Sequence, residues 1–331
     1  MEKYSSGNIS DLIYKMRSIQ SSFTDEYGVT DIWSNSKIFE ILIANTLHHD
    51  LIPGHSGTLD AKDSTGNEYE YKHFKQSSSN HSWTFNDFSD TTIQKLNEQV
   101  HQVIFAHIED ANPTPTMDFA FVVEGRQVSN YLSQYTERIA NHRKMINVSP
   151  NQIRNRLGIN ETTYNQTLED GPYGQLLQDI FTTSWELEKI VGVSNILTSN
   201  KLWEVIVSLP LGHQVNSEQG GRAGAHDAQD ESGGEYEYKV SSSSSWNFQD
   251  ISENVLAKYL NCEAIILATV DKENLMVESI WTVEPSAIVN RLTEKLSEKN
   301  ERYQARGKSV RRLQASITKG DFLFTNAKRI I

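Results

Sequence analysis

Two segments of the chain carry the same set of residues suited to metal-assisted phosphodiester chemistry. Residues 60–72 read Asp-Ala-Lys-Asp-Ser-Thr-Gly-Asn-Glu-Tyr-Glu-Tyr-Lys, and nine of these thirteen positions are identical in residues 227–239. In a strand, alternation places Glu70 and Lys72 on one face and the intervening tyrosine on the other. A tight turn upstream can return Asp60 to the face of Glu70. Residues Asp227, Glu237 and Lys239 repeat this spacing.

Two carboxylates and a lysine are what metal-assisted hydrolysis of a phosphodiester requires. Magnesium prefers oxygen ligands and keeps several waters, so the two carboxylates can hold it. The ion polarises a phosphoryl oxygen, and the lysine orients the attacking group or offsets developing charge. The alternative is an exposed edge strand with a charged outer face. Because two copies have the same spacing, a catalytic site, either active or inherited from an active ancestor, is favoured over a charged edge strand.

The repetition extends beyond these segments and predicts a duplicated domain. The matching pairs are Lys37-Ile-Phe-Glu40 with Lys201-Leu-Trp-Glu204, Gly28-Val29 with Gly192-Val193, and Trp83-Thr-Phe85 with Trp246-Asn-Phe248. A chain of 331 residues is also long enough for two modules. We therefore predict one repeat over residues 1–160 and a second over residues 161–331.

Hydrophobic periodicity predicts the same order of elements in both repeats. We expect amphipathic helices at 9–26 and 173–190, then helices at 36–47 and 200–208, then the strand, turn and strand of each motif. Helices near 91–100 and 251–260 follow, then strands at 103–108 and 264–270 and at 119–123 and 276–281. The predicted class is α/β, with two tandem domains that each have a mixed sheet flanked by helices. Trp83 and Trp246 are predicted to be core residues.

Composition narrows the class of protein and its setting. The net charge of −12 argues against nonspecific binding to nucleic acid, but residues 302–329 hold eight basic residues and one acid. Phosphate contacts are expected there and in 138–156, unless these are only solvated basic faces. Cys262 is the sole cysteine, which excludes disulfides and a cysteine zinc site. No secretory signal or membrane-spanning stretch is visible, so a cytoplasmic location is expected.

The ordered motifs resemble the PD-(D/E)XK restriction endonucleases, and within them the PvuII-like type II enzymes. The residues that carry this resemblance are 28–32, 52–54 and 60–72 in the first repeat and 192–196, 227–239 and 283–285 in the second. The resemblance implies that Asp60, Glu70, Asp227 and Glu237 hold Mg²⁺ and that Lys72 and Lys239 assist the attack on double-stranded DNA.

The resemblance also implies how the chain assembles and what accompanies it. Enzymes of this family act as two-fold dimers in which each subunit cuts one strand. A tandem chain would combine both subunits in a monomer with internal pseudo-two-fold symmetry. The helices at 9–26 and 173–190 are candidates for the contact between repeats. A sequence-specific nuclease also implies a partner DNA methyltransferase that spares the host DNA.

The two repeats depart from the family pattern where bases are read. The family has a run of histidines after a loop phenylalanine, which corresponds to Phe85 and Phe248 here, and both repeats lack that run. Short segments stand in its place, and their polar side chains could contact base edges. Asp31 of the first repeat corresponds to Asn195 in the second. The family's Lys-Tyr pair is kept in the second repeat as Lys258-Tyr259, whereas the first repeat has Lys95-Leu96. Tyr259 is a candidate for supporting the active site. The candidate DNA-binding residues are Asp31, Asn195, Arg222, Asp87 and Asp250.

Three functions fit these observations. The first is a type II restriction endonuclease with two active sites, which would give discrete cleavage of plasmid DNA. The second is a catalytically silent, sequence-specific DNA-binding protein. Intact charged triads weigh against it, because a lost site usually loses buried charges. The third is a repair or recombination nuclease that prefers branched or mismatched DNA to plain duplex.

Overall fold

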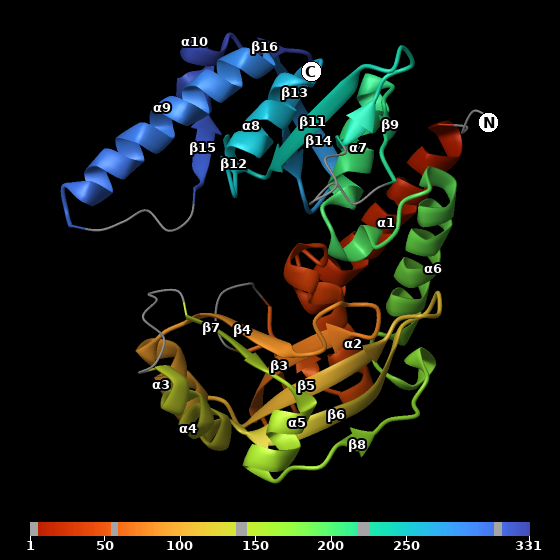
Figure 1. Cartoon of the computed structure of the whole chain (residues 1–331). Helices are drawn as coiled ribbons and strands as arrows, with labels where there is room; N and C mark the ends of the chain where they lie inside the picture. The colour runs from red at the N-terminus through yellow and green to blue at the C-terminus, as the bar shows by residue number, and fades with distance from the viewer. Residues whose placement is uncertain (1–5, 54–58, 137–143, 218–225, 308–312) are drawn as a thin grey trace. The chain divides into compact units, whose positions relative to one another are not determined.

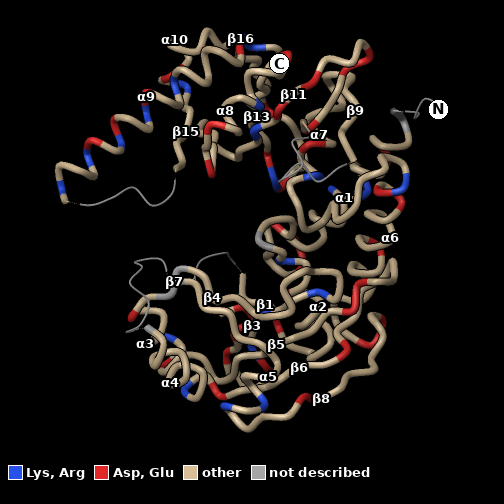
Figure 2. Tube along the Cα trace, viewed as in Figure 1, with Lys and Arg blue, Asp and Glu red and all other residues tan. Residues whose placement is uncertain are grey.

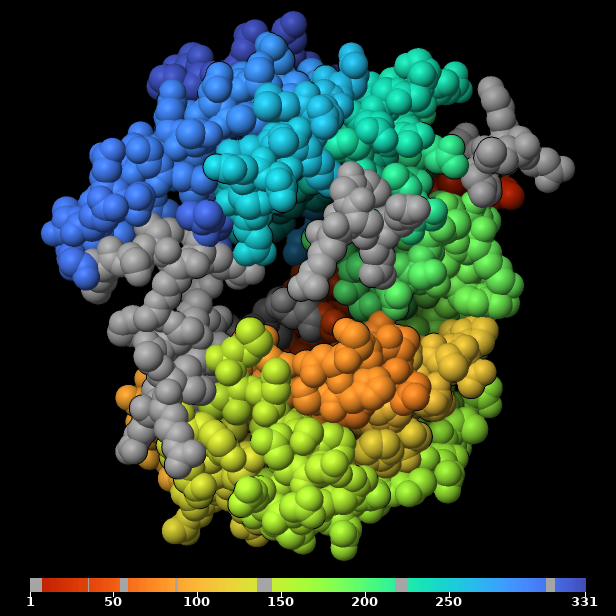
Figure 3. Space-filling model, in the orientation of Figure 1, coloured from red at the N-terminus to blue at the C-terminus, as the bar shows by residue number. Residues whose placement is uncertain are grey.

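The computed structural model describes residues 6–53, 59–136, 144–217, 226–307 and 313–331, which are coloured in Figure 3. The chain forms two compact units. The first unit is Ser18–Trp185, and the second combines Met1–Arg17 with Glu186–Ile331. The divisions fall inside the long helices α1 (Ser6–Tyr27) and α6 (Gly174–Val191), so each helix contributes residues to both units. The repeat boundary near residue 160 stays a prediction from sequence.

The first unit is built on a mixed six-stranded sheet with the order β1-β2-β3-β5-β6-β8 (Figure 1). Strand β3 pairs in parallel with β5, whereas the other neighbours in the sheet pair antiparallel. A separate ribbon pairs β4 with β7. The strands are β1 (Asp50–Leu51), β2 (Ala61–Lys62), β3 (Glu68–Lys75), β4 (Trp83–Phe88), β5 (Gln102–Glu109), β6 (Thr116–Glu124), β7 (Lys144–Val148) and β8 (Thr162–Thr163).

Helices flank this sheet because each has an apolar side to bury. Helix α2 packs against β3 and β6, and α3 packs against α4, which covers β5 and β6. The helices are η1 (Ser34–Ser36), α2 (Lys37–Leu47), α3 (Asp90–Glu98), α4 (Gly125–Thr136), α5 (Pro150–Gln152), η2 (Ile153–Leu157) and η3 (Leu168–Asp170). Trp83 lies fully buried in the core and donates from its indole Nε1 to the Ala106 carbonyl at 2.7 Å.

The second unit repeats this pattern of pairing. Its sheet has the order β16-β14-β13-β11-β10-β9, β11 pairs in parallel with β13, and β12 pairs with β15. Trp246 is fully buried and donates to the Ala268 carbonyl at 2.8 Å. The strands are β9 (Gln214–Val215), β10 (Ala228–Gln229), β11 (Glu235–Ser241), β12 (Ser245–Phe248), β13 (Ala264–Asp271), β14 (Met276–Val283), β15 (Ala315–Thr318) and β16 (Lys328–Arg329).

Helices α7 and α9 cover the second sheet. Helix α7 packs against β11 and β14, and α9 packs against β13, α8 and β15. The helices are η4 (Ile196–Thr198), α7 (Lys201–Leu211), α8 (Glu253–Leu260), α9 (Pro285–Gln304), η5 (Lys319–Asp321) and α10 (Phe322–Thr325). Acidic and basic residues alternate along α9 (Figure 2), so its charged surface is mixed in sign.

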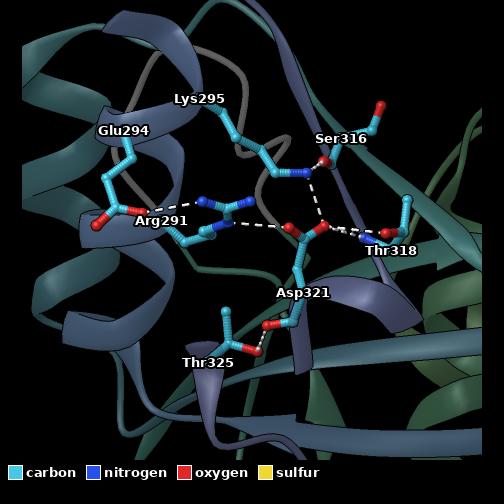
Figure 4. A network of polar contacts seen from close by, with 7 residues as sticks. All are labelled: Arg291, Glu294, Lys295, Ser316, Thr318, Asp321 and Thr325. Carbon is cyan, nitrogen blue, oxygen red and sulfur yellow. Dashed lines mark hydrogen bonds and ion pairs between the residues drawn. The ribbon is translucent and has the colours of Figure 1, made fainter. Parts of the chain in front are cut away.

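A buried carboxylate holds the C-terminal segment of the second unit to α9. Asp321 accepts from Arg291 Nε at 2.9 Å, from Lys295 Nζ at 2.6 Å and from the Thr318 amide at 2.9 Å (Figure 4). These contacts lower the pKa of Asp321 to about 2 although burial acts in the opposite direction. The charge-assisted bonds fix the position of β15 and the turn that follows it.

The predicted α/β class, with mixed sheets flanked by helices, is confirmed. Each predicted helix and strand has a counterpart within a few residues of its expected ends. Helix α7 runs to Leu211, three residues past the predicted 208, and contains Pro210 in its last turn. The ribbons β4–β7 and β12–β15 and the helices α4 and α9 were not predicted as elements. No helix among the described residues is long and apolar enough to cross a membrane.

Candidate active sites

The turn between β2 and β3 returns the chain so that Asp60 meets the strand that carries Glu70 and Lys72. Asp63 Oδ1 accepts from the Thr65 amide at 2.8 Å and from the Asn67 amide at 2.9 Å, which closes the turn. Gly66 has a φ of 87°, a backbone conformation that glycine adopts without strain. The Asp60 amide then donates to the Tyr69 carbonyl at 2.8 Å. Local hydrogen bonds therefore place Asp60 beside β3.

The three residues of the first triad lie together on this strand pair. The Tyr71 amide donates to Asp60 Oδ2 at 2.6 Å. Lys72 Nζ donates to Glu70 Oε1 and, at 3.2 Å, to the Tyr71 carbonyl. Tyr71 is buried on the opposite face. The alternation expected from the sequence thus brings both carboxylates and the lysine into one site.

Burial and crowding of like charges control the electrostatics of the first site. The pKa of Asp60 is raised well above its usual value, first by burial and then by repulsion from Glu70 and Glu40. Burial also raises the pKa of Glu70, and the nearby Lys72 ammonium only partly offsets it. Burial lowers the pKa of Lys72, but attraction to Glu70 and Asp60 outweighs it and leaves the pKa raised. Lys72 is therefore a cation that offsets two crowded carboxylates.

The second triad repeats two of these hydrogen bonds. The Tyr238 amide donates to Asp227 Oδ2 at 2.8 Å, and Lys239 Nζ donates to Glu237 Oε1 at 2.8 Å. Burial and then repulsion from Glu237 raise the pKa of Asp227. The pKa of Glu237 differs in direction from that of Glu70: burial raises it, but Lys239 and Lys258 together leave it lowered.

Sequence reasoning missed a buried lysine–glutamate pair beside each triad. Lys37 Nζ lies 2.7 Å from Glu40 Oε2 on α2, and Lys201 Nζ lies 2.5 Å from Glu204 Oε2 on α7. Burial and then repulsion from Asp227 raise the pKa of Glu204 to about 7. The signal was present in the sequence, because both pairs repeat at the same helical spacing. Their proximity to the triads depends on how α2 and α7 pack against the sheets.

Aromatic rings lie beneath the triad lysines. Lys72 Nζ is 5.4 Å from the centre of the Phe85 ring, and Lys239 Nζ is 5.4 Å from the Phe248 ring. The buried Tyr259 ring is 5.5 Å from Lys239 Nζ, so this residue, expected to support the site, does lie against the triad. Cation–π attraction of this kind helps to hold an ammonium in place.

The candidate DNA-binding residues have local contacts that shape the backbone. Asp31 Oδ1 accepts from the Trp33 and Ser34 amides, each at 3.0 Å. Asn195 and Asp250 adopt left-handed backbone angles, with φ of 61° and 50°. The backbone of Asp87 lies in β4, not in a loop as expected, at an irregularity between Phe85 and Phe88, which both pair with β7. The Asp87 side chain and Arg222 lie outside the described residues.

The donor atoms of each triad suit a hard divalent cation. Within the described ranges no group of three or more histidine, cysteine, aspartate or glutamate residues is arranged as a metal centre. Each triad instead offers two carboxylates. The Glu70 and Glu237 Oε2 atoms are buried and accept no hydrogen bond of good geometry from the described part of the chain, although Lys258 Nζ forms an ion pair with Glu237 Oε2 at 3.0 Å. Mg²⁺ is commonly held by one or two carboxylates and completes its shell with water and phosphate, so the residues present fit it.

The mixed sheet with an Asp, Glu and Lys on adjacent strands agrees with the resemblance to the PD-(D/E)XK restriction endonucleases expected from the sequence. Residues 5–156 match the family model described as restriction endonuclease PvuII. The match confirms the predicted PvuII-like resemblance for these residues. It supports nuclease activity and binding to double-stranded DNA at the level of the family. No curated protein matches the chain.

Proposed function

We propose that the chain is a type II restriction endonuclease with two Mg²⁺-dependent active sites, one in each repeat. The observation that carries this proposal is the intact triad in both units, held by equivalent hydrogen bonds from the Tyr71 and Tyr238 amides. A single chain with two sites can act as a pseudo-dimer and cut both strands of a duplex. A sequence-specific enzyme of this kind requires a companion DNA methyltransferase.

The residues of each triad have distinct roles in this proposal. Asp60 with Glu70, and Asp227 with Glu237, would hold Mg²⁺ through their carboxylates. Bound Mg²⁺ supplies Lewis-acid polarisation of the scissile phosphate. Lys72 and Lys239 each stay protonated, since neighbouring carboxylates raise the pKa of both. They therefore orient the attacking water and offset negative charge that develops on the phosphate oxygens, instead of removing a proton.

Strand-specific nicking tests both the activity and the number of sites. Purified protein is incubated with several unmethylated plasmids and Mg²⁺, and cleavage at discrete positions is expected. Lys72→Met and Lys239→Met should each convert double-strand cleavage into nicking of one strand, and the two variants should nick opposite strands. Methionine keeps the length of the side chain but removes its charge. Lys62→Met, at an exposed position of β2, is the matched control and should keep double-strand cleavage.

Two outcomes would contradict the proposal in different ways. The absence of cleavage on every plasmid, with folded protein and saturating Mg²⁺, would refute nuclease activity on plain duplex. Full double-strand cleavage by either single lysine variant would show that the corresponding triad is not an active site. Circular dichroism of each variant verifies that the protein is folded.

A further inference from the structure

The two triads differ at one ion pair. Lys258 Nζ forms an ion pair with Glu237 Oε2 at 3.0 Å, whereas Glu70 in the first triad has an ion pair only at Oε1, with Lys72, among the described residues. Lys95 occupies the position equivalent to Lys258: it follows the capping Ser89 of α3 by six residues, just as Lys258 follows the capping Ser252 of α8. The structure shows no ion pair of Lys95 with Glu70 among the described residues.

The contact between Lys258 and Glu237 is sheltered from water. The side chains of Lys258 and Glu237 are 18% and 7% exposed. Glu237 thus has a cation on each oxygen, because Lys239 Nζ binds Oε1 at 2.8 Å. An ammonium held in a partly buried site is screened less than one at the surface, so it opposes the approach of another cation.

The neighbouring residue on α8 strengthens this difference. Tyr259 packs edge-on against Phe248, with ring centroids 5.7 Å apart, and both rings lie near Lys239 Nζ. The equivalent residue on α3 is Leu96, an aliphatic side chain buried in the core. The tight packing of Tyr259 fixes the end of α8 and hence the place of the adjacent Lys258.

We propose that Lys258 is a positioning residue that lowers the Mg²⁺ affinity of the second site, so that the two sites fill with metal in order. The first site, where Glu70 Oε2 has no ion pair among the described residues, fills at lower Mg²⁺. The second fills only when the metal displaces the Lys258 ammonium from Glu237 Oε2. This inference rests on the proposed function, and it makes a nicked duplex the first product when Mg²⁺ is scarce.

Calorimetric titration with Mg²⁺, without DNA and at pH 8, tests this order of affinities directly. Asp60→Asn combined with Glu70→Gln leaves only the second site, and Asp227→Asn combined with Glu237→Gln leaves only the first. The isolated second site should bind Mg²⁺ more weakly, by about tenfold, which corresponds to about 1.4 kcal/mol.

Substitution of Lys258 separates its charge from its packing. In the isolated second site, Lys258→Met should tighten Mg²⁺ binding by about tenfold, whereas Lys258→Arg keeps the charge and should leave it weak. Lys95→Met, in the isolated first site, is the matched control and should have no effect. A merely structural role of Lys258 would not distinguish methionine from arginine in this way. Circular dichroism identifies any variant that fails to fold, and the arginine variant then still tests the charge.

Cleavage in the otherwise unaltered chain supplies a second measurement. At a Mg²⁺ concentration between the two dissociation constants, the wild-type chain should accumulate nicked circles, and Lys258→Met should give linear DNA directly. Equal Mg²⁺ affinities at the two isolated sites would overturn the inference and leave the proposed nuclease intact. The predicted difference in affinity without cleavage of any DNA would support the inference and overturn the proposed function. The absence of Mg²⁺ binding at both sites would overturn both.

Discussion

The carboxylate of Asp321 offers the sharpest test of what holds the second unit together. Its pKa falls from an ordinary value of 3.8 to about 2, because Arg291, Lys295 and Thr318 bind the ionised form. Each pKa unit corresponds to about 1.4 kcal/mol, so this ionised carboxylate contributes about 2 kcal/mol to the free energy of unfolding. Asp321→Asn should lose about this amount, since it leaves two cations without their partner.

The pH dependence of this contribution has a definite sign. A carboxylate whose pKa is lowered in the folded state stabilises the fold above its unfolded-state pKa, near 4. The contribution is lost as the pH falls toward the folded-state value of about 2. The difference between wild type and Asp321→Asn should therefore be constant from pH 7 to about 5 and fall to about half by pH 3.

Hydrogen exchange followed by mass spectrometry localises the effect. Amides of β15 and α9 should exchange faster in Asp321→Asn under urea, while amides of β5 in the first unit serve as an internal reference. Glu294→Gln is the matched control, because Glu294 also pairs with Arg291, at 3.0 Å, but its side chain is 59% exposed. Such a surface ion pair contributes less than about 1 kcal/mol to the free energy of unfolding. Equal effects of the two variants, or a difference that grows as the pH falls, would refute the reasoning.

Two further predictions concern the first unit. Repulsion from Glu40 contributes to the raised pKa of Asp60, so Glu40→Gln should move the acid limb of cleavage by the first site to lower pH. A pH–rate profile that does not move would contradict this. Asn45 donates to the Leu168 carbonyl at 2.9 Å and accepts from the Tyr173 amide at 2.7 Å, both buried. Asn45→Ala should therefore lower the free energy of unfolding by about 2–3 kcal/mol in urea denaturation, and a loss below about 0.5 kcal/mol would show that these bonds do not hold the segment.

Much of the candidate site could be predicted from the sequence because its parts are close along the chain. Strand alternation placed Glu70 and Lys72 together, and the turn from Asp63 to Gly66 returned Asp60 within ten residues. The same short-range rules acted again on residues 227–239, so the second triad required no additional information. Helices and central strands were also predictable, since their apolar periodicity is a local property of the sequence.

The pairs added by α2 and α7 could not be placed in the same way. Glu40 and Glu204 lie 30 and 33 residues before the triad glutamates, and their sequence spacing indicates only that each pairs with a lysine one helical turn away. Whether such a pair faces the sheet or solvent depends on how the helix packs. The ribbons β4–β7 and β12–β15 likewise join segments about 60–70 residues apart, which no local pattern specifies.

The sequence by itself determined the duplicated triads, the classes of the elements that carry them and the kind of chemistry they suit. These properties follow from backbone hydrogen bonding and side-chain alternation, which act over a few residues. Only the tertiary structure decided that Lys258 contacts Glu237, that Glu40 influences Asp60, and that the compact units divide inside α1 and α6. Such contacts depend on long-range packing, and so two nearly identical motifs acquired different electrostatic surroundings.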